Sequence, residues 1–181
     1  MRLVLADRDG VLNEDRPEGV QRPQDLQLIP GAAAAVRRLN AAGIPVALVT
    51  NQSALGRGLI GWNELEAIQA RLEAELAAEG ARLDLVLVAP DAPERAGPGR
   101  KPAPGMLLEA MERFRVAPAD AVMIGDDLRD LEAAAAAGCR RILVETGKGA
   151  RIAETGIPER LQPVQVCDSF ARAVDLLLRA G

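Results

Sequence analysis

The segment Leu3–Gly10 reads Leu-Val-Leu-Ala-Asp-Arg-Asp-Gly, so an apolar run ends in two carboxylates, Asp7 and Asp9. Apolar residues flanked by charged ones predict a short buried strand. In open α/β sheets, ligands bind at the carboxyl ends of the strands, which is where these two side chains would lie. Because Asp and Gly also end strands simply to turn the chain, the segment alone leaves a plain turn as the alternative to an active site.

The composition describes a globular chain that is poorly suited to nucleic acid. Of its 181 residues, 49% are hydrophobic and 27% are charged, and the net charge is −4. An acidic chain with one Trp, two Phe and no Tyr offers few cations and few rings on which bases could stack. The chain has no histidine, so its chemistry must use carboxylates, Lys, Arg, hydroxyls or an oxygen-liganded metal.

The sequence also predicts where the protein works and with what it associates. Cys139 and Cys167 lie far apart beside apolar residues, as expected for small core residues in a reducing compartment. The amino terminus runs straight into the first predicted strand, and no apolar run has membrane length. We therefore expect a cytoplasmic monomer that acts on a small molecule and binds neither nucleic acid nor a membrane.

Apolar runs alternate with segments of helical periodicity along the rest of the chain. Further strands are predicted at residues 45–49, 83–88, 121–124 and 141–144, with a short edge strand at 164–166. Helices are predicted at residues 32–42, from Asn63 to Gly80, from Pro104 to about Phe114, up to Ala137, and at 169–179. Strands that alternate with helices predict an α/β fold with a parallel sheet covered on both faces.

The connections carry expectations of their own. Residues 11–30 are polar and turn-rich, which predicts a short flap over the strand ends. Residues 54–58 predict a flexible loop that carries one cation, Arg57. Asn63, with Glu66 three residues later, predicts an N-cap for the next helix. In the helix that begins at Pro104, we expect Leu107, Leu108, Met111 and Phe114 to face the core.

Polar residues follow several of these strands: Asp7 and Asp9, Thr50 and Asn51, Arg100 and Lys101, and Asp126, Asp127 and Asp130. The carboxyl ends of parallel strands share one edge, so these side chains should meet there. Crowded carboxylates need a cation, and oxygen-only ligands favour Mg²⁺ over Zn²⁺ or Cu²⁺. Taken singly, the same residues fit ordinary roles as caps, helix N-terminal acids or surface cations. Their joint occurrence favours a phosphate site.

The order of these motifs resembles that of the haloacid dehalogenase (HAD)-like phosphatases. Within them, it resembles the branch of the histidinol-phosphate and D-glycero-D-manno-heptose 1,7-bisphosphate phosphatases. The resemblance covers residues 1 to about 146 and rests on Asp7-Arg8-Asp9-Gly10 with Asn13, Thr50-Asn51-Gln52-Ser53, Arg57, Arg100-Lys101-Pro102 and Gly125-Asp126-Asp127-x-x-Asp130. It implies a Rossmann-like three-layer sandwich with a mainly parallel sheet, formed as a single domain over residues 1–181 without a large cap domain.

The resemblance also implies roles in catalysis. Asp7 would be the nucleophile that forms an aspartyl-phosphate, and Asp9 would protonate the leaving oxygen and then deprotonate water. Thr50 and Lys101 would hold the transferring phosphoryl oxygens.

For the metal and the substrate, the resemblance implies three groups of residues. Mg²⁺ would be held by Asp7, the backbone carbonyl of Asp9 and Asp126, with support from Asp127 and Asp130. The residues that match substrate-contacting positions are Asn51, Arg57 and Arg100.

The implied activity is hydrolysis of a small phosphate monoester, with D-glycero-D-manno-heptose 1,7-bisphosphate as the leading substrate. Histidinol phosphate or another small monoester is the alternative within this class. A phosphoryl-accepting signalling module is the alternative from another class, because receiver domains also gather acids, a hydroxyl and a lysine at strand ends.

Two departures from the branch affect these expectations. The branch commonly has a zinc loop before Arg-Lys-Pro, and its four ligand positions correspond to Ala89, Asp91, Gly97 and Gly99 within residues 89–100. We therefore expect no zinc. The branch also usually has a basic residue where this chain has Asp127, and that carboxylate is expected to weaken the binding of a doubly charged ester.

Overall fold

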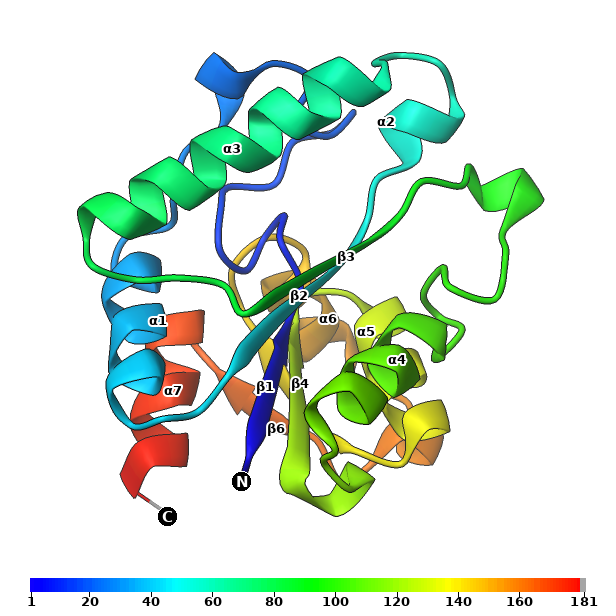
Figure 1. Ribbon diagram of the computed structural model, residues 1–181. Helices are drawn as coiled ribbons and strands as arrows, with labels where there is room; N and C mark the ends of the chain where they lie inside the picture. Colours follow the sequence, from blue (N-terminus) through cyan, green and yellow to red (C-terminus); the bar gives the residue numbers. More distant parts are fainter. Residues whose placement is uncertain (180–181) are drawn as a thin grey trace.

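The computed structural model describes residues 1–179, so the expected domain over residues 1–181 extends two residues beyond the described part. A six-stranded sheet lies at its centre, with the strand order β3-β2-β1-β4-β5-β6 (Figure 1). Every pairing between neighbouring strands in this order is parallel. The strands are β1 (Leu3–Ala6), β2 (Val46–Asn51), β3 (Leu85–Ala89), β4 (Ala121–Gly125), β5 (Arg140–Val144) and β6 (Gln165–Cys167).

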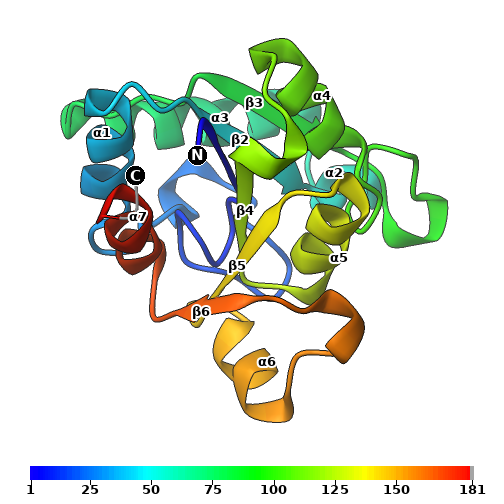
Figure 2. The same ribbon diagram turned by 90° about the horizontal axis from the view of Figure 1, so that it is seen from below.

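Helices cover both faces of this sheet, as Figure 2 shows from below. The α-helices are α1 (Ala32–Ala41), α2 (Ser53–Gly56), α3 (Trp62–Ala78), α4 (Gly105–Phe114), α5 (Leu128–Ala137), α6 (Gly149–Thr155) and α7 (Phe170–Arg179). One core cluster joins the sheet to α1, α3 and α7, and a second joins it to α4 and α5. The predicted three-layer sandwich with a parallel sheet is therefore confirmed.

Strand β1 shows why a continuous apolar run was needed. Val4 and Ala6 pack into the first core cluster, whereas Leu3 and Leu5 pack into the second. Successive side chains of a strand point to opposite faces, so a strand buried on both faces must be apolar throughout. The chain runs outward from β1 to β3 on one side and from β4 to β6 on the other. The crevice where this order reverses, between β1 and β4, is where such sheets bind ligands.

Two expectations near the carboxyl edge of the sheet were wrong. Residues 54–58 do not form a flexible loop, because Ser53–Gly56 makes the short helix α2. A Cβ on Gly56 would lie 2.3 Å from the backbone nitrogen of Ala92, so this turn packs directly on the loop after β3. Helix α3 begins before Asn63: its N-cap is Gly61, whose N–H donates to a Glu64 carboxylate oxygen at 2.9 Å.

Further differences concern the α4, α6 and flap segments. Leu108 of α4 was expected to face the core of the protein but is 46% exposed. Met106 and Ala110 of the same helix are buried in the core instead. Helix α6 begins at Gly149, within a segment that was expected to be a loop at residues 147–149, and was not predicted. The flap at residues 11–30 was expected to be polar, but its apolar side chains are buried and join it to the first core cluster: Val11, Leu12, Val20, Leu26 and Ile29.

The segments that connect the strands and α-helices contain only short 3-10 turns as further regular structure. The flap contains a 3-10 turn (Pro23–Asp25), and further 3-10 turns lie at Pro93–Arg95, Pro118–Asp120 and Glu159–Leu161. Over residues 1–179, no insertion is large enough to form a separate cap domain. Every helix in that range is too short or too polar to cross a lipid bilayer.

Candidate active site

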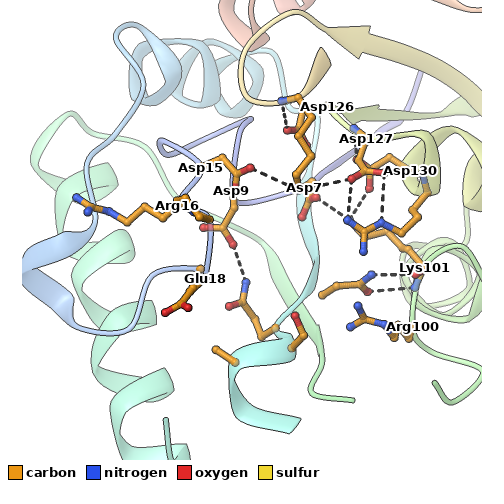
Figure 3. A pocket seen from close by; sticks show the side chains of 18 of the residues that line it. Asp7, Asp9, Asp15, Arg16, Glu18, Arg100, Lys101, Asp126, Asp127 and Asp130 are labelled. Atoms are coloured by element: carbon orange, nitrogen blue, oxygen red, sulfur yellow. Dashed lines mark hydrogen bonds and ion pairs between the residues drawn. The ribbon is translucent and has the colours of Figure 1, made fainter. Parts of the chain in front are cut away.

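A cleft opens at the carboxyl edge of the sheet, beneath the flap (Figure 3). It is lined by nine of the ten sequence-predicted site residues: Asp7, Asp9, Asn51, Arg57, Arg100, Lys101, Asp126, Asp127 and Asp130. The tenth, Thr50, is buried at the end of β2, next to Gln52, which does line the cleft. Residues separated by more than a hundred positions therefore meet at one edge, as parallel strands require.

A buried lysine lies between two of the carboxylates. The ammonium nitrogen of Lys101 lies 3.0 Å from Oδ2 of Asp7 and 2.6 Å from Oδ1 of Asp130. Burial would lower the pKa of Lys101, whose side chain is 1% exposed, but the charges of Asp130 and Asp7 raise the pKa above its usual value. Lys101 is therefore a fixed cation beside the proposed nucleophile.

Three carboxylates crowd together beside this lysine. Oxygen atoms of Asp7, Asp126 and Asp130 all lie within 4.8 Å of one another. Burial and the charges of Asp130 and Asp7 raise the pKa of Asp126 to about 8. Burial raises the pKa of Asp130 to about 6 against the lowering effect of Lys101, and Asp7 adds to the rise.

The backbone around Asp126 is shaped to admit its carboxylate. A Cβ on Gly10 would lie 2.2 Å from Oδ2 of Asp126, and a Cβ on Gly147 would lie 2.1 Å from the same atom. Both glycines have positive φ, so side chains are excluded there by conformation as well as by space. The N–H of Lys148 donates to that oxygen at 2.9 Å. Like charges held this closely, with oxygen-only donors, fit a hard divalent cation such as Mg²⁺.

Asp9 is bound within a separate set of hydrogen bonds. Arg8, which is fully buried, donates to both Asp9 oxygens, and Asn13 and Gln52 each donate to Asp9 at 2.9 Å. Burial alone would raise the pKa of Asp9, but the charge of Arg8 and the hydrogen bonds from Asn13, Gln52 and Arg8 outweigh burial and lower the pKa. Asp9 is thus held as a carboxylate in the free protein.

Asn51 fixes the position of the loop that carries Lys101. Its amide nitrogen donates to the backbone carbonyl of Lys101 at 2.9 Å, and its amide oxygen accepts from the Lys101 N–H at 3.1 Å. Both polar ends of the side chain are engaged with backbone, so Asn51 is placed to position Lys101. Arg100, which is also buried, donates to the backbone carbonyl of Asp91 at 2.7 Å.

Asp127 forms the N-cap of α5 and has two cationic neighbours. Its carboxylate accepts from Nε and Nη2 of Arg129 at 3.2 and 2.7 Å, and the ammonium of Lys148 lies 3.5 Å away. Burial would raise the pKa of Asp127, but the hydrogen bonds and charge of Arg129 and the charge of Lys148 lower it to about 2. Lys148 also lies 3.4 Å from Asp15 of the flap.

Several residues of the cleft were not singled out from the sequence. Gln52 donates to Oγ1 of Thr50 at 2.9 Å as well as to Asp9, and it links the two motifs. Lys148 follows β5 at the same edge of the sheet, so the rule that located the other polar residues could have found it. Asp15 and Arg129 reach the cleft from the flap and from the first turn of α5, where side-chain direction could not be predicted.

Two family models match the chain, and relatives match it over nearly its full length. The models are described as haloacid dehalogenase-like hydrolase, at residues 4–59, and HAD-hydrolase-like, at residues 99–173. A D-glycero-beta-D-manno-heptose-1,7-bisphosphate 7-phosphatase of Bordetella bronchiseptica is 39% identical over 180 residues, covering 99% of each chain. One of Pseudomonas putida is 40% identical over 159 residues, covering 88% of this chain and 91% of the relative.

The solved structures give the same result. The D,D-heptose 1,7-bisphosphate phosphatase of B. bronchiseptica, complexed with magnesium and phosphate, superposes with a TM-score of 0.93 at 39% identity and covers 100% of both chains. The enzyme from Burkholderia thailandensis has a TM-score of 0.76 at 36% identity, covering 98% of this chain and 99% of that one. The chain therefore belongs to the haloacid dehalogenase-like hydrolases and is a phosphatase of that family.

Proposed function

We propose that this phosphatase hydrolyses D-glycero-D-manno-heptose 1,7-bisphosphate, or a closely related small sugar phosphate, with Mg²⁺ and an aspartyl-phosphate intermediate. The observation that carries this proposal is the cluster of Asp7, Asp126 and Asp130 within 4.8 Å, with Lys101 beside it. Relatives that are 39% and 40% identical are named for this substrate, which supports the choice of sugar.

Asp7 is proposed as the nucleophile. An Asp7 carboxylate oxygen forms the bond to phosphorus while the bond from phosphorus to the ester oxygen breaks. The Arg8 N–H donates to Oδ1 of Asp7 at 2.7 Å, and Lys101 lies 3.0 Å from Oδ2, so the carboxylate is held in one orientation before substrate arrives. When bound by Asp7, the Asp9 carbonyl and Asp126, Mg²⁺ would neutralise charge on the phosphoryl group.

Asp9 is proposed to move protons in both halves of the reaction. It gives a proton to the departing ester oxygen, and it then takes one from the water that attacks phosphorus and releases Asp7. Its lowered pKa in the free protein means that it does not carry that proton before substrate binds. A phosphate anion beside Asp9 raises the pKa of the carboxyl by repulsion, so the proton would arrive with the substrate.

Thr50 and Lys101 are proposed to hold the transferring phosphoryl oxygens. Oγ1 of Thr50 accepts from Gln52, which leaves its own O–H free to donate to an anion. Asn51 would act through its two hydrogen bonds to the Lys101 backbone. Arg57 and Arg100 line the cleft and are proposed to contact the rest of the substrate.

The experiment is a phosphate-release assay with Mg²⁺ present and then chelated. The substrates are D-glycero-D-manno-heptose 1,7-bisphosphate, other sugar phosphates and histidinol phosphate. We expect fastest release from the heptose bisphosphate and none after chelation. Undiminished turnover by folded Asp7→Asn would overturn the nucleophile, and stable phosphoprotein without phosphate release would favour a signalling module instead.

We also propose that residues 1–181 form one domain that works in the cytoplasm as a monomer without zinc. One sheet takes strands from residue 3 to residue 167, and the two cysteines are buried and unpaired. The loop at residues 89–100 has no thiol or imidazole, which supports the absence of zinc. Light scattering and metal analysis of the purified protein test the oligomeric state and the metal content.

A further inference from the structure

The residue that follows Gly125-Asp126 in this chain is an acid, and it lines the cleft. In the structure this acid, Asp127, does not face the cleft as an unpaired charge. Arg129 donates to both of its oxygens, and Lys148 lies 3.5 Å away. Arg129 therefore neutralises Asp127, and the ammonium of Lys148, which also lies 3.4 Å from Asp15, is a second cation at this point of the cleft.

The guanidinium of Arg129 has hydrogen-bonding capacity left for a ligand. A guanidinium has five N–H donors, and the carboxylate of Asp127 accepts from Nε and Nη2 only. Over residues 1–179, Asp127 is the only side chain that accepts from this guanidinium. The Arg129 side chain is 40% exposed and lines the cleft, so its remaining donors are accessible to a molecule bound there.

Two other guanidinium groups lie near Arg129. Arg57 and Arg100 line the same cleft, and burial, the charge of Arg129 and the charge of Arg57 lower the pKa of Arg100. Arg57, Arg100 and Arg129 thus present guanidinium groups along one cleft, and guanidinium groups are well suited to bind the oxygens of a phosphate through paired hydrogen bonds. The transferring phosphoryl group would instead lie at Asp7 and Lys101, which are already paired at 3.0 Å.

We propose that Arg129, held in position by Asp127, binds the substrate's second anionic group, the phosphate that is not transferred. This inference rests on the proposed function, because it assigns a bisphosphate to the same cleft. Arg129 then supplies the positive charge that residue 127 lacks, and Asp127 is a positioning residue for it. The repulsion expected from Asp127 is offset by the cation that it holds.

The test compares two substrates that differ only in the second phosphate: D-glycero-D-manno-heptose 1,7-bisphosphate and its 7-phosphate. For Arg129→Gln, we expect KM for the bisphosphate to rise about 10- to 100-fold, with kcat and the KM for the 7-phosphate changed less than about threefold. Arg129→Lys keeps the charge and should restore part of the preference. Asp127→Asn keeps an N-cap acceptor but holds Arg129 less firmly, so we expect a smaller rise in KM for the bisphosphate.

Arg113→Gln is the matched control. Arg113 is an exposed arginine of α4 that pairs with Glu109, so its loss should change neither KM. Equal effects of Arg129→Gln on both substrates, or no effect on either, would overturn the inference. Failure of the wild-type protein to hydrolyse the heptose bisphosphate contradicts the proposed function. The variants are then compared on fructose 1,6-bisphosphate and fructose 6-phosphate, where loss of the bisphosphate preference still supports a role for Arg129 and its retention refutes it.

Discussion

Replacing Asp126 by Asn is expected to stabilise the metal-free protein at pH 8. Burial and the charges of Asp130 and Asp7 raise the pKa of Asp126 to about 8, whereas the unfolded chain has an ordinary value near 3.8. The folded state therefore binds this proton more tightly than the unfolded state does. The resulting stability is fully present below about pH 4 and is lost as the pH rises to 8. Asn carries no charge and avoids this loss.

The size of the effect follows from the shift in pKa. A difference of about 4 pKa units corresponds to roughly 6 kcal/mol, at about 1.4 kcal/mol per unit. Water entering the open cleft and relaxation of the side chains reduce this upper limit to about 2–4 kcal/mol. For a chain of this length, such a difference raises Tm by about 5–15 °C.

Thermal unfolding with EDTA between pH 5 and pH 8 measures the difference. We expect the wild-type Tm to fall across this range and the Tm of Asp126→Asn to change much less. Added Mg²⁺ should raise the wild-type Tm at pH 8 and leave the variant nearly unchanged. Asp168→Asn, at an exposed acid, is the control and should follow the wild type. A wild-type Tm that is constant with pH, or equal stabilisation of both proteins by Mg²⁺, would refute this account.

Three further substitutions test other parts of the site. Lys101→Ala removes the cation beside the nucleophile, so we expect kcat/KM to fall at least about 100-fold in steady-state kinetics, and an unchanged value would contradict the assigned role. Gly10→Ala places a Cβ 2.2 Å from an Asp126 oxygen, so Mg²⁺ affinity measured by calorimetry should weaken about tenfold or more. Gln52→Leu removes a donor to Asp9, so the limb of the pH profile that reports its pKa should move about one unit upward.

The fold could be predicted where local sequence and tertiary packing agree. The strand at Leu3–Ala6 follows from a run that had to be buried on both faces, and Gly138 ends α5 with a left-handed conformation, as its position indicates. Helix α2 could not be predicted, because Gly56 packs against backbone that is distant in sequence. The N-cap Gly61 has no side chain that could mark the start of α3.

The candidate site could be predicted as a set of polar residues at strand ends, but not as a set of contacts. Topology brings Asp7, Lys101 and Asp126 together, and no side-chain detail is needed to expect it. The partners of each charge depend on rotamers and loop paths. For this reason Asp127 was expected to repel an anion, although Arg129 and Lys148 neutralise it in the structure.

The two-point contact of Asn51 with the backbone of Lys101 separates the chemistry of the cleft from the loop that precedes it. The lysine takes its backbone position from the end of β2, so changes at the exposed tip of the loop, residues 93–96, should leave the ammonium group in place, whereas Asp91 and Ala92 are tied to Arg100 and Gly56. This exposed tip is a site where a designer could graft a foreign peptide.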